Sequence, residues 1–549
     1  MPDTASWHPD PTFRGTWGIV STCVSTLIIC VWNAIHFNIP PRDQKWSFLH
    51  KLPWLLCGLF APDLLIIVAG DQLDDDARFI SAAARRYLRT RCSSVRDNLS
   101  LAESVPLTGS EANDKLSDSG SKSSGLSNRE HAWTLAHSFY AYMGGFVLDS
   151  SLTPAFGTDK TLTLAPRLFV FLMEHAPDII PDISEADIQR KGKSSWLAKA
   201  LLVSQLLYFS ISCAARLAQK LSLTLLEVWT LAHALGAIGI YVLWWKKPFD
   251  AAEPIVIGGE QAQEFAAYFQ MVARYTISAG FSDTQAYAEG IYYLKITAST
   301  ESTVTQDQQT DLLERENWPI TLLAGNSIQL EGYTFTVQAR KPDPDNDILF
   351  AKTPRPWYAR ERGPDGSVSV SKADVQRWRL AARAATRLGG IWEQPADMEL
   401  RRTSGLWELS SSLQGSSGSE LALFAAMWVI PTMCALLHVL GWNATFPTLA
   451  ERILWRVGAV VTSAGPTAFF LAAIIGSDLE DRVKTANSPV LSHVLRILSW
   501  TGSALMFTVA FLYVLSNLYF FVESIRQLLY LPDDAFLLPS FSVYFPHFS

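Results

Sequence analysis

The stretch LLEVWTLAHALGAIGIYVLWW, residues 225–245, decides the fold class of this chain. It contains one charged side chain, Glu227, and is followed at once by Lys246 and Lys247. An α-helix of about 20 apolar residues, rising 1.5 Å per residue, crosses a hydrocarbon core of roughly 30 Å. Tryptophan followed by lysine is typical of the point where such a helix leaves a bilayer. The stretch therefore predicts a membrane-spanning helix.

Further stretches share this character, and they are residues 18–37, 53–70, 196–217, 421–440, 453–475 and 494–521. The stretch 53–70 is the shortest and contains Pro62 and Asp63, so it either spans the membrane or is re-entrant. The predicted fold class is an all-α polytopic membrane protein of about seven transmembrane helices with a small α+β cytosolic insert.

The composition agrees with a membrane protein and excludes other classes. The chain has 549 residues, of which 49% are hydrophobic and 18% charged, whereas soluble domains carry about 25% charged residues. The net charge of −7 argues against a nucleic-acid partner, which normally requires a basic face. The six cysteines have neither metal-ligand spacing nor the pattern of a disulfide scaffold. No nucleotide-binding or hydrolase motif occurs, so no cofactor and no catalytic residue are predicted.

The segments between the stretches divide the chain into parts of different composition. Residues 97–128 are rich in Ser and Asp without apolar periodicity, which predicts disorder, and residues 327–338 alternate apolar and polar side chains as strands do. The predicted parts are an N-terminal tail with two spans (1–70), an amphipathic cytosolic helix (71–96), a disordered Ser-rich linker (97–128), a cytosolic or membrane-associated helical segment (129–195), two spans (196–245), the cytosolic α+β insert with a flexible hinge (246–420), three spans (421–521) and a non-cytosolic C-terminal tail (522–549).

Two of these parts leave alternatives open. The helix 71–96, with Arg85 and Arg86 opposite its apolar side chains, either lies on anionic lipid or is a solvated connector. Residues 131–148 are aromatic-rich and marginal as an eighth membrane segment, and a buried or membrane-lying helix is favoured there.

Lys and Arg near the span ends set the orientation. They gather on the side that holds the N-terminus, the segment after the second span and the insert, and this side is predicted to be cytosolic. The C-terminus is then lumenal or extracellular. The sequon Asn443-Ala444-Thr445 falls on that non-cytosolic side and predicts a glycosylated Asn443. If residues 53–70 are re-entrant, the N-terminus changes side.

Asp63 is the most specific candidate site. A carboxylate inside a span costs about 2.5–3.5 kcal/mol on insertion scales, so it should face protein or water. Pro62 removes a helical hydrogen bond beside it, and Glu227 is a second acid in an apolar stretch. These three residues are candidates for a transport site. The alternative is a structural carboxylate that is paired with backbone donors or with a polar group of a neighbouring helix, or that lies at a helix end if the second span is interrupted.

The histidines are weaker candidates. His36 and His438 lie near the same predicted membrane face and are the one pair that could hold a haem or metal ion. A core histidine is the more frequent role of such residues, and no metal site is predicted.

Several strings, taken in order, resemble a family of fungal multi-pass integral membrane proteins of unknown function. They include RGTW (14–17), CVWNAIHFNIP (30–40), WWKKPFD (244–250), ERILWR (451–456) and YFPH (544–547). The likeness covers most of the membrane part, whereas the insert and the Ser-rich linker look variable. It implies a topology and a fungal origin rather than a reaction.

Three functional hypotheses follow. A channel or transporter is favoured by Asp63 and the interrupted second span. A seven-span receptor or signalling scaffold is the alternative, supported by the Ser-rich linker. A membrane-embedded enzyme is the least favoured, because such enzymes cluster carboxylates or histidines near one membrane face, and here they are scattered. The predicted partners are the lipid bilayer and an unknown small-molecule or ion ligand.

Overall fold

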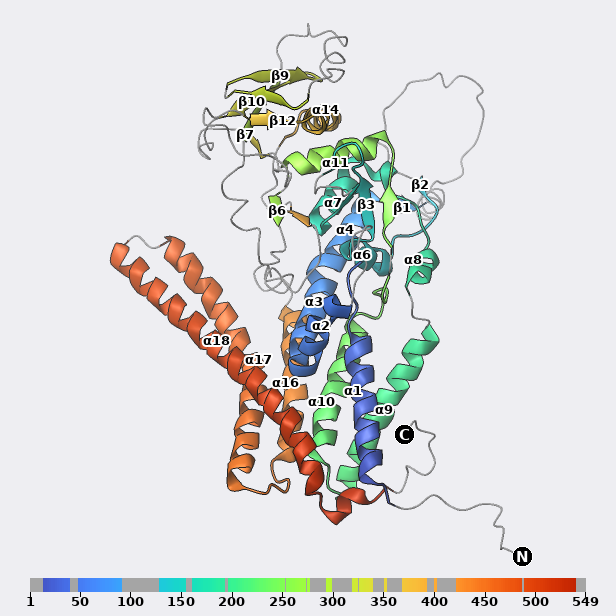
Figure 1. Ribbon diagram of the computed structural model, residues 1–549, viewed down its shortest axis with the longest axis vertical. Coiled ribbons are helices and arrows are strands. Elements are labelled where there is room, and N and C mark those ends of the chain that lie inside the picture. Colours follow the sequence, from blue (N-terminus) through green and yellow to red (C-terminus); the bar gives the residue numbers. More distant parts are fainter. Residues whose placement is uncertain are drawn as a thin grey trace, which may run out of the picture.

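The computed structural model describes residues 13–39, 48–90, 128–154, 160–192, 196–251, 253–272, 274–276, 293–298, 318–323, 325–338, 350–352, 368–392, 399–401, 421–485 and 488–539. Figure 1 shows a bundle of helices below and a globular part, which holds the β-strands, above it. The predicted linker 97–128 lies almost wholly outside the described residues, as does most of the predicted hinge near residue 410.

The bundle is built around α10 (Leu225–Leu243). The helices packed against it are α1 (Thr16–Ala34), α3 (Pro62–Asp71), α9 (Trp196–Ala218), α16 (Leu421–Leu436) and α18 (Pro489–Arg526), together with the 3-10 helix η3 (Leu437–Gly441). Thr224 caps the N-terminus of α10, because its side chain accepts from the amide of Glu227 and the Glu227 carboxylate accepts from the amide of Thr224. This reciprocal cap fixes where the helix begins.

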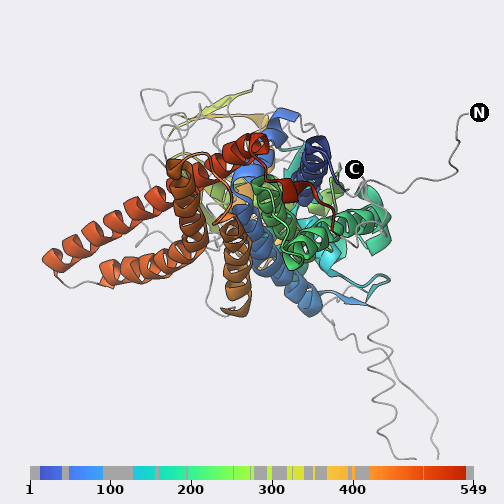
Figure 2. The same cartoon turned by 90° about the horizontal axis from the view of Figure 1, so that it is seen from below.

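A long antiparallel hairpin leaves the bundle. It consists of α17 (Leu449–Thr485) and α18, which pack against each other, and both views show it projecting away from the other helices (Figures 1 and 2). In the apolar stretch of α18 only 11% of the residues are buried. Large apolar side chains such as Trp500, Phe507 and Phe511 are therefore exposed.

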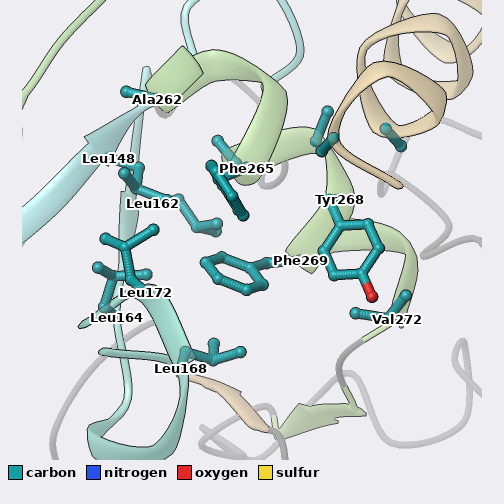
Figure 3. Packing of buried hydrophobic residues seen from close by; sticks show 14 of the residues in the cluster. Leu148, Leu162, Leu164, Leu168, Leu172, Ala262, Phe265, Tyr268, Phe269 and Val272 are labelled. Carbon is teal, nitrogen blue, oxygen red and sulfur yellow. The ribbon is translucent and has the colours of Figure 1, made fainter. Parts of the chain in front are cut away.

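The globular part begins where α3 continues into the π-helix η1 (Gln72–Arg78) and α4 (Phe79–Tyr87). Its first sheet has the order β4 (Thr161–Thr163), β3 (Phe146–Asp149), β5 (Ile255–Ile257), with β3 antiparallel to β4 and parallel to β5. Figure 3 shows Leu148 and Leu162 of this sheet meeting Phe265 and Phe269 of α11 (Glu260–Val272). The remaining helices here are α6 (Leu135–Tyr142), α7 (Pro166–His175), the 3-10 helix η2 (Pro177–Ile179) and α8 (Glu185–Lys191).

A second sheet lies farther from the bundle, in the order β11 (Phe350–Lys352), β7 (Tyr293–Ala298), β10 (Tyr333–Gln338), β9 (Ser327–Leu330). The helix α14 (Lys372–Arg387) packs on α11 and contacts β9, so it joins the two halves of the globular part. Short pairs complete it: β1 (Arg89–Thr90) with β2 (Asn128–Arg129), β6 (Arg274–Thr276) with β13 (Glu399–Arg401), and β8 (Ile320–Leu322) with β12 (Val368–Val370).

The predicted all-α protein of about seven spans is wrong. Within the described residues three helices are long and apolar enough to cross a membrane, namely α1, α10 and residues 490–529, which include most of α18. A fourth is reached only if α2 (Phe48–Phe60) and α3 count as one bent span. The chain also forms small sheets.

The other predicted spans do not qualify within the described residues. The described apolar parts of α9 and of α16 with η3, Leu202–Ala218 and Trp428–Gly441, are shorter than the three helices that do. The predicted span 453–475 lies in α17, which is not among the helices that are long and apolar enough to cross a membrane. The side chains of residues 469, 470 and 472–474 in this helix are not described.

Residues 131–148 form the buried helix favoured there only in part, as α6, whose residues from Ala136 to Tyr142 are buried. The helix α6 ends at Tyr142, a turn follows, and the chain continues as β3. Gly144 has φ +82°, a conformation that glycine adopts without strain and that ends a helix. Phe146 and Leu148 are fully buried in the core of the globular part.

The two ends of the described chain meet at one end of the bundle. Phe13 and Leu537 form a β-bridge, and the amide of Arg14 donates to the carbonyl oxygen of Phe536 at 2.8 Å. The predicted orientation places the N- and C-termini on opposite membrane faces, whereas the described segments at Arg14 and Phe536 lie together. The bend between α2 and α3 is the reason.

Candidate functional site

The interruption predicted near Pro62 is a sharp bend between α2 and α3. Their axes differ by 109°. Ala61 has the non-helical angles φ −147° and ψ 58°, and Pro62 is the first residue of α3, a position where its missing N–H costs nothing. Ile39, before α2, bonds to Met143, and Ile80, after α3, is buried in the core of the same globular part. The pair thus dips into the bundle and returns to the side it came from (Figure 1).

Asp63 lies at this bend, in the first turn of α3. Its side chain is buried and accepts a hydrogen bond from the hydroxyl of Tyr513 in α18. The N-terminus of a helix stabilises a carboxylate, because the unpaired amides there carry partial positive charge. Asp63 is therefore held by a helix end and a neutral donor rather than by an ion pair.

His233 lies on the other side of the bend, near the middle of α10. Its Nδ1 is 2.9 Å from the carbonyl oxygen of Trp229, and its Nε2 is 2.9 Å from the carbonyl oxygen of Leu59, at the end of α2. A small cavity adjoins the ring and is lined by Cys30, Val31, Ala34, Gly58, Pro62, Leu65, His233, Ala237 and Ile240. We call Asp63, Tyr513, His233 and the Leu59 carbonyl group the break site.

Close packing surrounds the break site. A methyl group in place of the Gly236 hydrogen would lie 3.6 Å from Ile66 of α3 and 3.9 Å from the Cys434 sulfur of α16, which is ordinary van der Waals contact, so α3 and α16 both pack against this part of α10. His438 is buried one turn beyond Cys434, with Nδ1 3.0 Å from the carbonyl oxygen of Ala435 and its ring stacked on Phe520.

The candidate pair His36 and His438 is not brought together. His36 packs against Tyr241 and Trp244 at the C-terminal end of α10. His438 belongs to η3, and its neighbour Gly441 lies against Leu225 at the N-terminal end of α10. Within the described residues no three His, Cys, Asp or Glu side chains are placed to hold a metal ion.

Glu227 also lies apart from Asp63. It precedes His233 by six residues, which is about 9 Å along the helix, and it forms an ion pair with Arg14 at 2.6 Å. Arg216 of α9 donates to the carbonyl oxygens of Leu537 and Ala535 nearby. This polar cluster fastens both described chain ends to α10, and its acid is already neutralised.

Asn443 is exposed in the short loop between η3 and α17. The side-chain nitrogen of Arg456 lies 3.4 Å from its Oδ1. The loop lies at the end of the bundle where the two described chain ends meet (Figure 1). The second sequon, at Asn98, is outside the described residues.

Sequence reasoning found Asp63 and Pro62 but missed their partners. Tyr513 is 450 positions away from Asp63, and nothing local connects them. The available signal was Tyr513 and Asn517 at a spacing of four within an otherwise apolar helix, which places both on one face. The contact of His233 with Leu59 had no signal, because it depends on the bend.

These features define a class: a helical bundle built around the apolar helix α10, with three or four helices apolar enough to cross a membrane and a sharp bend between α2 and α3. The chain belongs to a family of unknown function, DUF8562, whose model matches residues 1–317 and 419–548. The unmatched residues 318–418 contain β8 to β13 and α14. No curated protein and no solved structure matches the chain. The resemblance to fungal multi-pass membrane proteins stays a prediction.

Proposed function

We propose that this protein is a multi-pass integral membrane protein that acts as a channel or transporter, with the break site as its binding centre. One observation carries the proposal: Asp63 is buried at the tip of a bent helix pair, inside an apolar bundle. Ionisable groups in such surroundings are expensive and typically mark ion or substrate pathways.

The position of the bend supports the same function. Many transporters bind substrate near the bilayer midplane, where the N-terminus of an interrupted helix faces an anion and free carbonyl groups face a cation. Here the N-terminus of α3 holds Asp63, and the last turn of α2 offers the Leu59 carbonyl to His233 near the middle of α10. A continuous helix would satisfy its own backbone, so the interruption needs the polar partners that the break site supplies.

The proposed orientation places the globular part in the cytosol. Lys246 follows α10 on that side, and Arg85 and Arg86 of α4 are exposed there, which agrees with the excess of basic residues in cytosolic segments. Both described chain ends and Asn443 then lie on the non-cytosolic side, and Asn443 is a glycosylation site.

The proposal is tested by ion flux into liposomes that contain the full chain. The expected result is proton, Na⁺ or K⁺ flux that Asp63→Asn lowers at least tenfold and Tyr513→Phe lowers less, because the carboxylate remains. The control is Asp533→Asn, an exposed acid, which should leave flux unchanged. Full flux in correctly folded Asp63→Asn, or no flux of these ions through the unchanged protein, would overturn the proposal and favour a scaffold.

A further inference from the structure

We infer that the ion bound at the break site is a proton and that His233 holds it. The inference rests on the proposed function, since it names the ion that this site binds. It starts from the hydrogen-bond geometry of the imidazole ring, which has an acceptor oxygen at each nitrogen.

A neutral imidazole has one N–H donor and one nitrogen lone pair. At His233 both ring nitrogens lie 2.9 Å from backbone carbonyl oxygens, which only accept. A neutral ring therefore directs a lone pair at one oxygen, whichever tautomer it adopts. An imidazolium donates to both oxygens, so binding a second proton completes the hydrogen bonds of the ring.

The Leu59 carbonyl explains why this contact matters for the bend. The last four carbonyl groups of a helix lack partners within the helix, and Leu59 is the second-last residue of α2. Since α2 ends at the bend, the His233 ring supplies the donor for this oxygen. The proton on Nε2 therefore ties the end of α2 to α10.

One acid lies near the ring, because Asp63 follows Pro62, which lines the same cavity as His233. The other titratable groups near this region are Cys30 of α1, Cys434 of α16, His438 of η3 and Tyr513 of α18. None of these four is a carboxylic acid. On α9, Cys213 and Arg216 lie toward the Glu227 end.

The donor set fits a proton better than a metal cation. Na⁺, Mg²⁺ and Ca²⁺ need several oxygen ligands around one point. At the break site the Tyr513 hydroxyl donates to Asp63, and the Leu59 oxygen faces the His233 ring. The adjoining cavity is lined by apolar side chains apart from His233 and Cys30, so it offers no oxygen cage.

The proton then controls access to the cavity. The protonated ring holds the end of α2 against α10 and keeps the cavity closed. The opening step requires the neutral tautomer that keeps its proton on Nδ1, toward the Trp229 oxygen. When the ring gives up its Nε2 proton to water, a lone pair faces the Leu59 oxygen, and α2 can move away. Cys30, which lines the cavity, becomes more accessible at high pH than at low pH.

The test measures alkylation of Cys30 by N-ethylmaleimide in the full chain in nanodiscs, by mass spectrometry of the Cys30 peptide. His233→Gln keeps a permanent donor toward Leu59, and His233→Leu keeps none. Rates are compared between variants at the same pH, so that the pH dependence of thiol reactivity cancels. Cys213, buried in α9, is the internal control.

At pH 5.5 the rate of Cys30 alkylation in the unchanged protein should equal that in His233→Gln within twofold. At pH 8.5 the unchanged protein should be alkylated at least fivefold faster than His233→Gln, and His233→Leu should be alkylated as fast as the unchanged protein. Exchange of Na⁺ for choline should change nothing. The inference is overturned if the ratio to His233→Gln is the same at both pH values, or if Na⁺ alters it. If His233→Leu fails to fold, the ratio to His233→Gln still decides. A pH-dependent ratio with no effect of Asp63→Asn on flux would retain the proton site and remove transport.

Discussion

At the scale of single residues, buried charged groups differ in the kind of partner they have. Glu227 is paired with Arg14, and Arg377 with Asp374, so in both pairs the opposite charge is built in. Asp63 has the neutral hydroxyl of Tyr513 instead. An ion pair fixes the charge of both members, whereas a carboxylate held by a hydroxyl can gain or lose a proton without leaving a partner charge buried. This difference separates the break site from the structural networks.

Replacing Arg377 tests how much a buried structural ion pair contributes to stability. Its side chain is 1% exposed and donates to Asp374 at 2.7 Å, to Gln270 at 2.6 Å and to the carbonyl oxygen of Pro154 at 3.0 Å. Arg377→Leu should lower the free energy of unfolding of the globular part by about 3–5 kcal/mol, because it leaves a buried carboxylate unpaired. Chemical denaturation followed by tryptophan fluorescence measures the loss. Lys372→Ala, a change at an exposed position of the same helix, should lower the free energy of unfolding by less than about 0.5 kcal/mol.

Glu331 gives a pH-dependent prediction. Partial burial alone would raise the pKa of its carboxyl group, but hydrogen bonds from Arg379 and Arg383 and their charges outweigh burial and hold the pKa below its usual value of 4.5. A depressed pKa means that the stabilisation is present above about pH 4.5 and is lost as the pH falls through the lower folded-state value.

Glu331→Gln should therefore destabilise the protein by about 1 kcal/mol at pH 7, and this difference should disappear as the pH falls through the folded-state pKa of Glu331, which lies below 4.5. Thermal melting of both proteins across this range measures it. Gln also has to adopt the left-handed backbone of Glu331, at φ +49°, so backbone strain cancels in the comparison. A constant difference at every pH would mean that the ion pairs contribute nothing.

At the scale of elements, local signals predict long apolar helices and fail where tertiary contacts decide. For α10, the sequence alone indicated the helix, because the apolar run and the closing tryptophans followed by lysines agree. The strand pattern at 327–338 likewise appears as β9 and β10. The pair α2 and α3 was ambiguous, since a proline and a carboxylate are compatible with both a kinked span and a re-entrant one. Only the packing against α10 and α18 selects the bend.

The junction of η3, α10 and α17 gives a prediction about packing. A methyl group on Gly441 would lie 2.6 Å from Nε1 of Trp455 and 2.8 Å from Leu225, and Trp455 Nε1 already donates to the His438 carbonyl oxygen at 3.0 Å. Gly441→Ala should destabilise the protein by about 1–3 kcal/mol through overpacking and change the fluorescence of Trp455. Gly502→Ala is the matched control: nothing lies within 4 Å of its added methyl group, so in mid-helix it should be neutral or stabilising by up to about 1 kcal/mol. Equal effects of both changes would contradict the packing argument.

At the scale of the whole molecule, the bend between α2 and α3 decides at which end of the bundle each chain segment lies. The chain enters α1 at the end where Phe13 meets Leu537 and leaves it beside the globular part. Because α2 and α3 return to that side, the N-terminal segment lies on the face opposite the globular part, together with the C-terminal segment. Lys and Arg counts alone gave the N-terminus the other side, since they assumed a full crossing at residues 53–70.

This topology predicts the outcome of glycosylation mapping. Expressed in eukaryotic cells, the protein should carry a glycan at Asn443, seen as a mass shift that glycosidase removes and Asn443→Gln abolishes. Acceptor sequons added on flexible tags at the N-terminus and, separately, at the C-terminus should both be glycosylated, because the segments of Arg14 and Phe536 are bonded to each other. A sequon inserted at the exposed Glu130 of the globular part should remain unmodified. Glycosylation of one terminal tag but not the other would mean that the chain crosses the membrane between α1 and α4, and the re-entrant bend on which the break site depends would then be wrong.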